Sequence, residues 1–161
     1  MSDPEANADF AAVFGDATLD GPADVIETHA ARVFLCGSRA FKMKKPVDLG
    51  FLDFSSRQKR YAALKAELDL NRPAAPQLYR ALTWIKRRGD GTLGLGGPGE
   101  AVEPVLEMAR FDQDQLLDRL ALAGQVDGPL ARDLADAVFE SHARARRAGG
   151  GAGGGGARRI R

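Results

Sequence analysis

The chain contains few of the residues that carry metal or redox chemistry. Its 161 residues include one cysteine, Cys36, and two histidines, His29 and His142. One cysteine cannot form an internal disulfide, which indicates a reducing, cytoplasmic location. Three scattered soft ligands do not make a zinc centre, so we expect no metal site. We expect Cys36 to pack inertly at the end of an apolar strand, His29 to be structural and His142 to be buried against a core.

The sequence also lacks any long apolar run and any strong excess of one charge. No stretch has the length or composition of a membrane span or a signal peptide, so we expect no membrane partner. The net charge is +1, which gives no general attraction to nucleic acid. The arginines near the C-terminus could contact phosphates weakly, but aromatic residues are not interleaved with them. We therefore do not expect a nucleic-acid partner.

The pattern of apolar residues predicts an α+β domain with an antiparallel sheet. Apolar positions at Phe10, Val13 and Phe14 predict a short helix within residues 3–14. The other expected elements are strands at 25–29, 32–36, 40–47, 78–85, 92–95 and 102–111, and helices at 57–71, 113–122 and 130–147. We divide the chain into an N-terminal helix and linker (1–22), a sheet domain of about five strands (23–111), a helical part (112–148) and an unstructured Gly/Arg tail (149–161).

Lysines at the end of the third expected strand are the first candidate functional residues. Side chains alternate between the faces of a strand, so Lys42 and Lys44 share one face while Phe41 and Met43 face the core on the other. Ala40 precedes Lys42 by two positions, as in the V-A-I-K pattern of protein kinases, where the lysine binds ATP phosphates. The alternative is a solvated basic edge strand, and the choice between Lys42 and Lys44 stays open.

Glu67 is the candidate partner of these lysines. Counting by helical turns puts it on the same face as Leu64, the apolar side of the expected helix at 57–71. A carboxylate on that side requires a cationic partner, because an unpaired buried charge is strongly destabilising. The alternative is a surface glutamate stabilised by nearby arginines.

Several ordered motifs give the chain a family resemblance. They are IETH at 26–29, VFL at 33–35, FKMKKPV at 41–47, GFLDFS at 50–55, ELDLNR at 67–72 and APQLY at 75–79, with weaker matches through MARF at 108–111, LLDRL at 116–120 and HARAR at 142–146. Across residues 24–147 the chain resembles the N-terminal part of bacterial aminoglycoside-phosphotransferase-like proteins, which are often fused to a P-loop kinase-type ATP-binding domain.

The resemblance implies a protein-kinase-like N-lobe, with one helix on an antiparallel sheet, followed by the first helices of a C-lobe. It implies that Lys42 or Lys44 binds ATP phosphates with Glu67 as its helix partner. Glu107, Met108 and Ala109 would belong to the hinge beside adenine. ATP and Mg²⁺ would be the cofactors, and the complete protein would phosphorylate a small hydroxylated acceptor.

The sequence departs from this family after the last expected helix. No His-Gly-Asp occurs, so the catalytic loop and the metal-binding aspartate are missing. We expect a fragment truncated before the catalytic loop and inactive alone, with no catalytic or metal-binding residue, whose exposed C-lobe helix favours self-association. The alternative is a non-catalytic nucleotide- or partner-binding regulatory module. Residues 94–99 are glycine-rich but lack the P-loop lysine, and residues 28–32, the expected phosphate-covering turn, contain no glycine.

Overall fold

A computed structural model describes residues 10–15 and 24–144 of the chain. It separates two compact units, the first ending at Gln115 and the second beginning at Leu116. The tail expected to be unstructured, residues 149–161, lies outside the described residues, as do most of residues 1–22. The division falls close to the boundary expected between residues 111 and 112.

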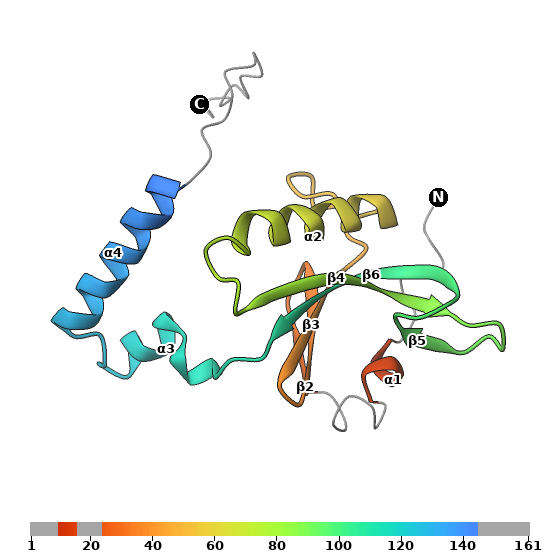
Figure 1. The fold of residues 1–161 in the computed structure, drawn as a ribbon, viewed down its shortest axis with the longest axis horizontal. Coiled ribbons are helices and arrows are strands. Elements are labelled where there is room, and N and C mark those ends of the chain that lie inside the picture. The colour runs from red at the N-terminus through yellow and green to blue at the C-terminus, as the bar shows by residue number, and fades with distance from the viewer. Residues whose placement is uncertain (1–9, 16–23, 145–161) are drawn as a thin grey trace, which may run out of the picture. The chain divides into compact units, whose positions relative to one another are not determined.

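The first unit is built on an antiparallel sheet of six strands (Figure 1). The strands are β1 (Asp24–Glu27), β2 (Ala31–Cys36), β3 (Arg39–Lys44), β4 (Tyr79–Arg87), β5 (Leu93–Leu95) and β6 (Glu100–Ala109), and their order is β1-β2-β3-β6-β4-β5. The α+β class and the antiparallel pairing are therefore as predicted. The sheet has one strand more than the count of about five given for the sheet domain, and each of its six strands overlaps one of the six expected ranges, including β5, which falls within 92–95.

Short turns connect the strands that pair as neighbours in sequence. Gly37, with φ of 51°, turns β2 into β3, which confirms the predicted antiparallel hairpin. The loop from β5 to β6 passes the end of β4 and contains Gly99 at φ of 131°. A Cβ atom on Gly99 would lie 2.3 Å from the Arg87 carbonyl oxygen, so the close approach of two backbones requires glycine here.

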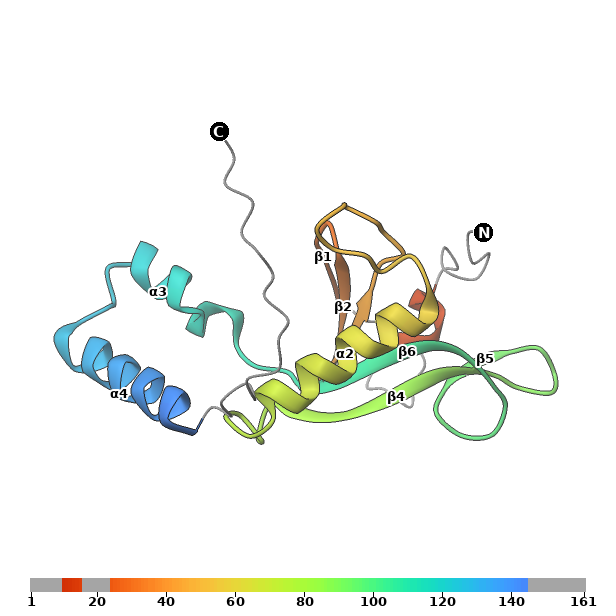
Figure 2. The same cartoon turned by 90° about the horizontal axis from the view of Figure 1, so that it is seen from above.

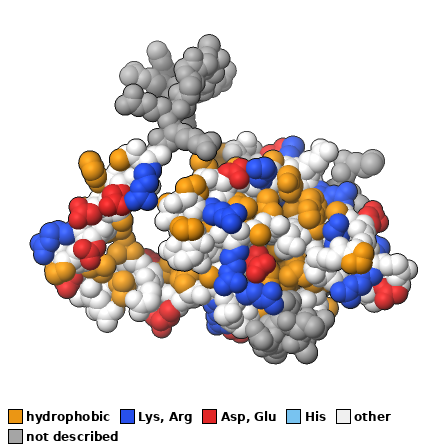
Figure 3. Space-filling view, in the orientation of Figure 1, with side chains coloured by type: hydrophobic (Ala, Val, Ile, Leu, Met, Phe, Trp, Pro, Cys, Tyr) orange, Lys and Arg blue, Asp and Glu red, His pale blue; other side chains and the backbone are white. Residues whose placement is uncertain are grey.

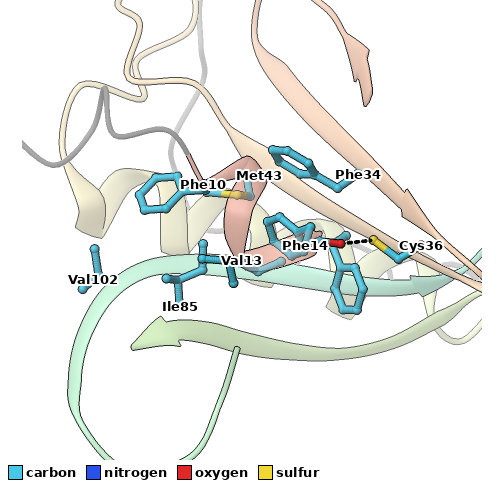
Figure 4. Close-up of a cluster of buried hydrophobic side chains, with 10 residues drawn as sticks. Phe10, Val13, Phe14, Phe34, Cys36, Met43, Ile85 and Val102 are labelled. Carbon is cyan, nitrogen blue, oxygen red and sulfur yellow. Dashed lines mark hydrogen bonds between the residues drawn. The ribbon is translucent and has the colours of Figure 1, made fainter. Parts of the chain in front are cut away.

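One face of the sheet packs on α1 (Ala11–Phe14) and the residue before it. Phe10, Val13 and Phe14 are buried, as their spacing predicted, and join side chains from β2, β3, β4 and β6 in one core (Figure 4). The Phe14 ring stacks on Phe34 at 4.3 Å between centroids. Cys36 is buried in the same core, and its thiol donates to the Phe14 carbonyl at 3.5 Å, which confirms its packing role.

The long helix α2 (Arg57–Asn71) contacts β3, β4 and β6 and lies along β4 and β6 in Figure 2. Its bounds agree with the predicted helix at 57–71. Ser56 caps it by accepting a hydrogen bond from the Lys59 backbone N–H at 3.3 Å. Leu64 is fully buried, and Tyr61 stacks on Trp84 of β4 at 5.4 Å between ring centroids. The helix is thus fastened to the sheet face that also carries Lys42 and Lys44.

The described residues of the second unit, 116–144, are mainly helical. The expected helix at 113–122 is divided into a 3-10 turn (Gln113–Gln115) and α3 (Leu117–Leu122), of which only α3 belongs to this unit. The next helix, α4 (Gly128–Arg144), begins two residues before its predicted start, because proline is tolerated in a first helical turn. His142 is exposed, so its predicted burial is wrong. Among the described residues, no helix combines the length and apolar character needed to cross a bilayer.

Candidate functional site

Lys42, Lys44 and Glu67 meet between β3 and α2. The Lys42 Nζ atom donates to Glu67 Oε1 at 2.6 Å, and the Lys44 Nζ atom donates to Glu67 Oε2 at 2.8 Å. Each oxygen of one carboxylate therefore binds a different lysine. This double bridge agrees with the prediction that a carboxylate on the apolar side of the helix takes its partner from the preceding strand. We call these three side chains the Lys–Glu–Lys cluster.

Strand alternation brings the two lysines to the same side of the sheet. Phe41 and Met43 are buried in the core beside α1, so Lys42 and Lys44 face α2 instead. On the helix, Leu64 is fully buried and Glu67 follows it by three positions, which places both on the sheet-facing side. The solvated edge-strand alternative is excluded for β3, because it lies between β2 and β6 in the sheet.

The cluster carries one more positive than negative charge. Burial alone raises the pKa of Glu67, and this is the largest single influence on the carboxyl. The hydrogen bonds and charges of Lys42 and Lys44 together outweigh burial, so the pKa of Glu67 lies below its ordinary value. Burial and the negative charge of Glu67 raise the pKa of the nearby Tyr79 phenol. With Glu67 ionised, two ammonium groups face one carboxylate and leave a local excess of one positive charge.

The two lysines have different surroundings. The Lys44 side chain is 13% exposed, and its Nζ atom lies 5.4 Å from the centroid of the buried Phe54 ring. The Lys42 side chain is 26% exposed, twice as much. Lys44 is therefore enclosed between an aromatic face and Glu67, whereas Lys42 is more open to solvent.

The three predicted hinge residues end β6 beside β3. Met108 pairs with Ala40 and Glu107 with Phe41, so Met108 shares the face of Lys42 whereas Glu107 lies on the other face. The Ala109 backbone N–H donates to the Leu78 carbonyl at 2.8 Å and is thereby occupied. The structure thus brings these residues next to the lysine strand without leaving the Ala109 N–H open to a ligand.

A second ion pair, absent from our sequence predictions, attaches α2 to strand β6 of the sheet. Arg60 and Glu103 form a bidentate pair at 2.6 and 2.7 Å, and both side chains are essentially inaccessible. Arg60 also donates to the Phe54 carbonyl at 3.1 Å. Two signals for the pair exist in the sequence. Arg60 precedes Leu64 by one helical turn, and Glu103 interrupts the apolar run of β6.

The described residues offer neither a cluster of metal ligands nor, on the face shown in Figure 3, a patch of one charge. Within residues 10–15 and 24–144, no three His, Cys, Asp or Glu side chains gather in a way that could hold a metal ion. Figure 3 shows basic and acidic side chains interspersed on the face in view rather than gathered by sign. The Lys–Glu–Lys cluster is accordingly the candidate functional site of the described residues.

Comparison with known proteins gives relatives without an assigned activity. The chain is 37% identical over 125 residues to Uncharacterized protein Mb2027c of Mycobacterium bovis, and equally to Uncharacterized proteins MT2060 and Rv2004c of Mycobacterium tuberculosis. The match covers 77% of this chain and 23% of each relative, so the chain spans about a quarter of the length of these relatives. No protein-family model matches the chain, and no solved structure matches it.

Proposed function

We propose that this chain binds the phosphates of ATP as the N-lobe of an aminoglycoside-phosphotransferase-like protein. The observation that carries the proposal is the Lys–Glu–Lys cluster, in which a helix glutamate holds strand lysines on the side of the sheet covered by α2. Kinase-like folds use such a pair to bind the α- and β-phosphates. The local excess of one positive charge suits an anionic ligand.

The neighbourhood of the cluster supports the same proposal. Ala40 is buried on the face of Lys42 and pairs with Met108 of β6, so a small residue separates the lysine from the proposed hinge. Because the Ala109 and Arg110 backbone N–H groups donate to Leu78 and Ser38, adenine would use other groups along this segment. Mg²⁺ would arrive with the nucleotide.

We infer that the complete protein is a cytoplasmic enzyme that transfers phosphate from ATP to a small hydroxylated acceptor. This chain would supply nucleotide contacts and no catalytic base, and we propose that it does not transfer phosphate on its own.

Calorimetric titration of the full chain with ATP and Mg²⁺ tests the proposal. We expect binding in the wild type and its loss in Lys42→Ala, because the removed ammonium contacts a phosphate. Lys65→Ala is the matched control, since this exposed lysine of α2 pairs with Asp69 away from the cluster. Absence of heat in the wild type, or equal loss in both variants, would refute nucleotide binding at this site.

A non-catalytic, partner-binding module is the second candidate function. It is favoured by the apolar side chains that α4 exposes, namely Leu134 at 42%, Val138 at 46% and Phe139 at 73%. Such a row on one helix is typical of a surface that packs on another protein segment. A second copy of the chain is the simplest occupant, and sedimentation over a range of concentrations tests it.

A further inference from the structure

We infer that Lys44 is a positioning residue, which holds Glu67 so that Lys42 binds the anionic phosphate. The inference rests on the proposed function and deepens it, because it assigns different roles to two lysines that the sequence left equivalent. Its basis is the asymmetry between the two halves of the Lys–Glu–Lys cluster.

Lys44 is the more enclosed of the two lysines. The Lys44 Nζ atom donates to Glu67 Oε2 on one side and lies over the Phe54 ring on another. An ammonium has three N–H donors, and a phosphate must approach those that remain. The side chain of Lys44 is 13% exposed against 26% for Lys42, so a ligand reaches the Lys42 ammonium more readily.

Lys42 lies closer than Lys44, along β3, to the proposed hinge. Ala40 pairs with Met108, the proposed hinge residue that shares the lysine face. Lys42 is two residues from Ala40, or about 7 Å along a strand, and Lys44 is four residues away, or about 14 Å. Lys42 therefore lies between the proposed adenine region and Lys44, where a phosphate chain leaving the hinge arrives first.

Contacts to both of its carboxylate oxygens hold Glu67. Glu67 lies on the C-terminal half of α2, and a single lysine bound to one of its oxygens would leave the other carboxylate oxygen to solvent. Lys44 occupies that second oxygen and fixes the plane of the carboxylate. With the carboxylate fixed, Glu67 orients Lys42 instead of following it.

A double-mutant cycle measured by titration with ATP and Mg²⁺ tests the assignment. The four proteins are wild type, Lys44→Met, Glu67→Gln and the double variant, with Lys42→Met added to each background. Methionine keeps the length of the side chain and removes its charge. The urea midpoint of each variant, followed by Trp84 fluorescence, identifies any variant that fails to fold.

We expect Lys42→Met to weaken binding roughly tenfold or more in the wild-type and in the Glu67→Gln background, as for a lost charge-assisted contact. Lys44→Met should weaken it about three- to tenfold in the wild type but less than about twofold when Glu67 is already glutamine, because its effect passes through that carboxylate. Lys44→Arg should bind ATP about as well as the wild type, unlike Lys44→Met, since arginine can donate to the same Glu67 Oε2 atom.

Two results overturn the assignment while leaving the proposed function intact. One is an equal loss of ATP affinity from Lys44→Met in the wild-type and in the Glu67→Gln background, which would mean that Lys44 contacts the phosphate itself. The other is retained binding in Lys42→Met. A wild type that binds no nucleotide overturns the proposed function instead, so the two failures can be told apart.

Discussion

Replacing Glu103 with glutamine removes the charge that faces Arg60 inside the first unit, and we expect this to destabilise the fold strongly. Both side chains are buried, and two hydrogen bonds of 2.6 and 2.7 Å join them. Breaking a buried ion pair from one side costs about 3–5 kcal/mol, because the remaining charge is left without its partner in a poorly solvating interior. In the Glu103→Gln variant, the buried Arg60 guanidinium would keep its charge but lose the carboxylate charge that offsets it.

The size of this loss can be compared with the stability of a domain of this length. At roughly 0.05–0.15 kcal/mol per residue, a unit of about 115 residues has a free energy of unfolding of roughly 6–17 kcal/mol. A loss of about 3–5 kcal/mol would remove a large share of it. The double variant Arg60→Met with Glu103→Leu removes both charges, so we expect a smaller loss. It should be about 1–3 kcal/mol, mainly from the Phe54 carbonyl that loses its donor.

Urea unfolding followed by tryptophan fluorescence provides the assay. Trp84 is the single tryptophan of the chain and stacks on Tyr61 of α2, so its emission reports the attachment of α2 to the sheet in the first unit. Lys65→Gln, which breaks the exposed pair with Asp69, is the matched control and should change the midpoint little. The single variants Arg60→Met and Glu103→Leu complete the comparison, and a double variant at least as unstable as the sum of their two losses would refute the reasoning, since the charges would then not depend on each other.

Three further predictions concern other parts of the molecule. The lowered pKa of Glu67 stabilises the folded state above the ordinary glutamate pKa of 4.5, and this contribution is lost as pH falls through the lower folded-state pKa. Urea midpoints from neutral to acidic pH should therefore fall less steeply in Glu67→Gln than in the wild type, and equal slopes would contradict this. Val138→Asp on α4 should reduce concentration-dependent association in sedimentation, whereas Leu122→Asp on α3, another exposed apolar site, should not; equal effects would contradict a role for α4. Gly99→Ala should lower the free energy of unfolding more than Gly97→Ala, because both have positive φ but only Gly99 would bring a Cβ atom against backbone; equal losses in urea unfolding would exclude the close approach.

The sequence predicted the parts of the candidate site that depend on simple periodicity. Alternation along β3 assigned Phe41 and Met43 to the core and Lys42 and Lys44 to the other face, and the core in the structure contains the first two. Helical spacing from Leu64 put Glu67 on the sheet-facing side of α2, where it meets both lysines. These two periods are local properties of the chain, and a sequence displays them directly.

Contacts between distant segments were harder to predict. The Arg60–Glu103 pair joins residues 43 positions apart, and its formation depends on the order of β3, β6 and β4 in the sheet. Burial of His142 was predicted from an assumed packing partner for α4, and the residue is exposed instead. Both cases depend on which surfaces meet, which periodicity along the chain does not specify.

The two attachments of α2 also bear on which length changes the chain can accept. Arg60 and Glu67 lie two helical turns apart and are held by different strands, Arg60 by β6 and Glu67 by β3. Inserting or deleting one residue between them would rotate one attachment by about 100° relative to the other, so both could not be made at once. A residue added to the exposed loop around Phe51 would leave both attachments in register. Natural insertions and deletions should therefore occur in the loop before α2 and not between Arg60 and Glu67.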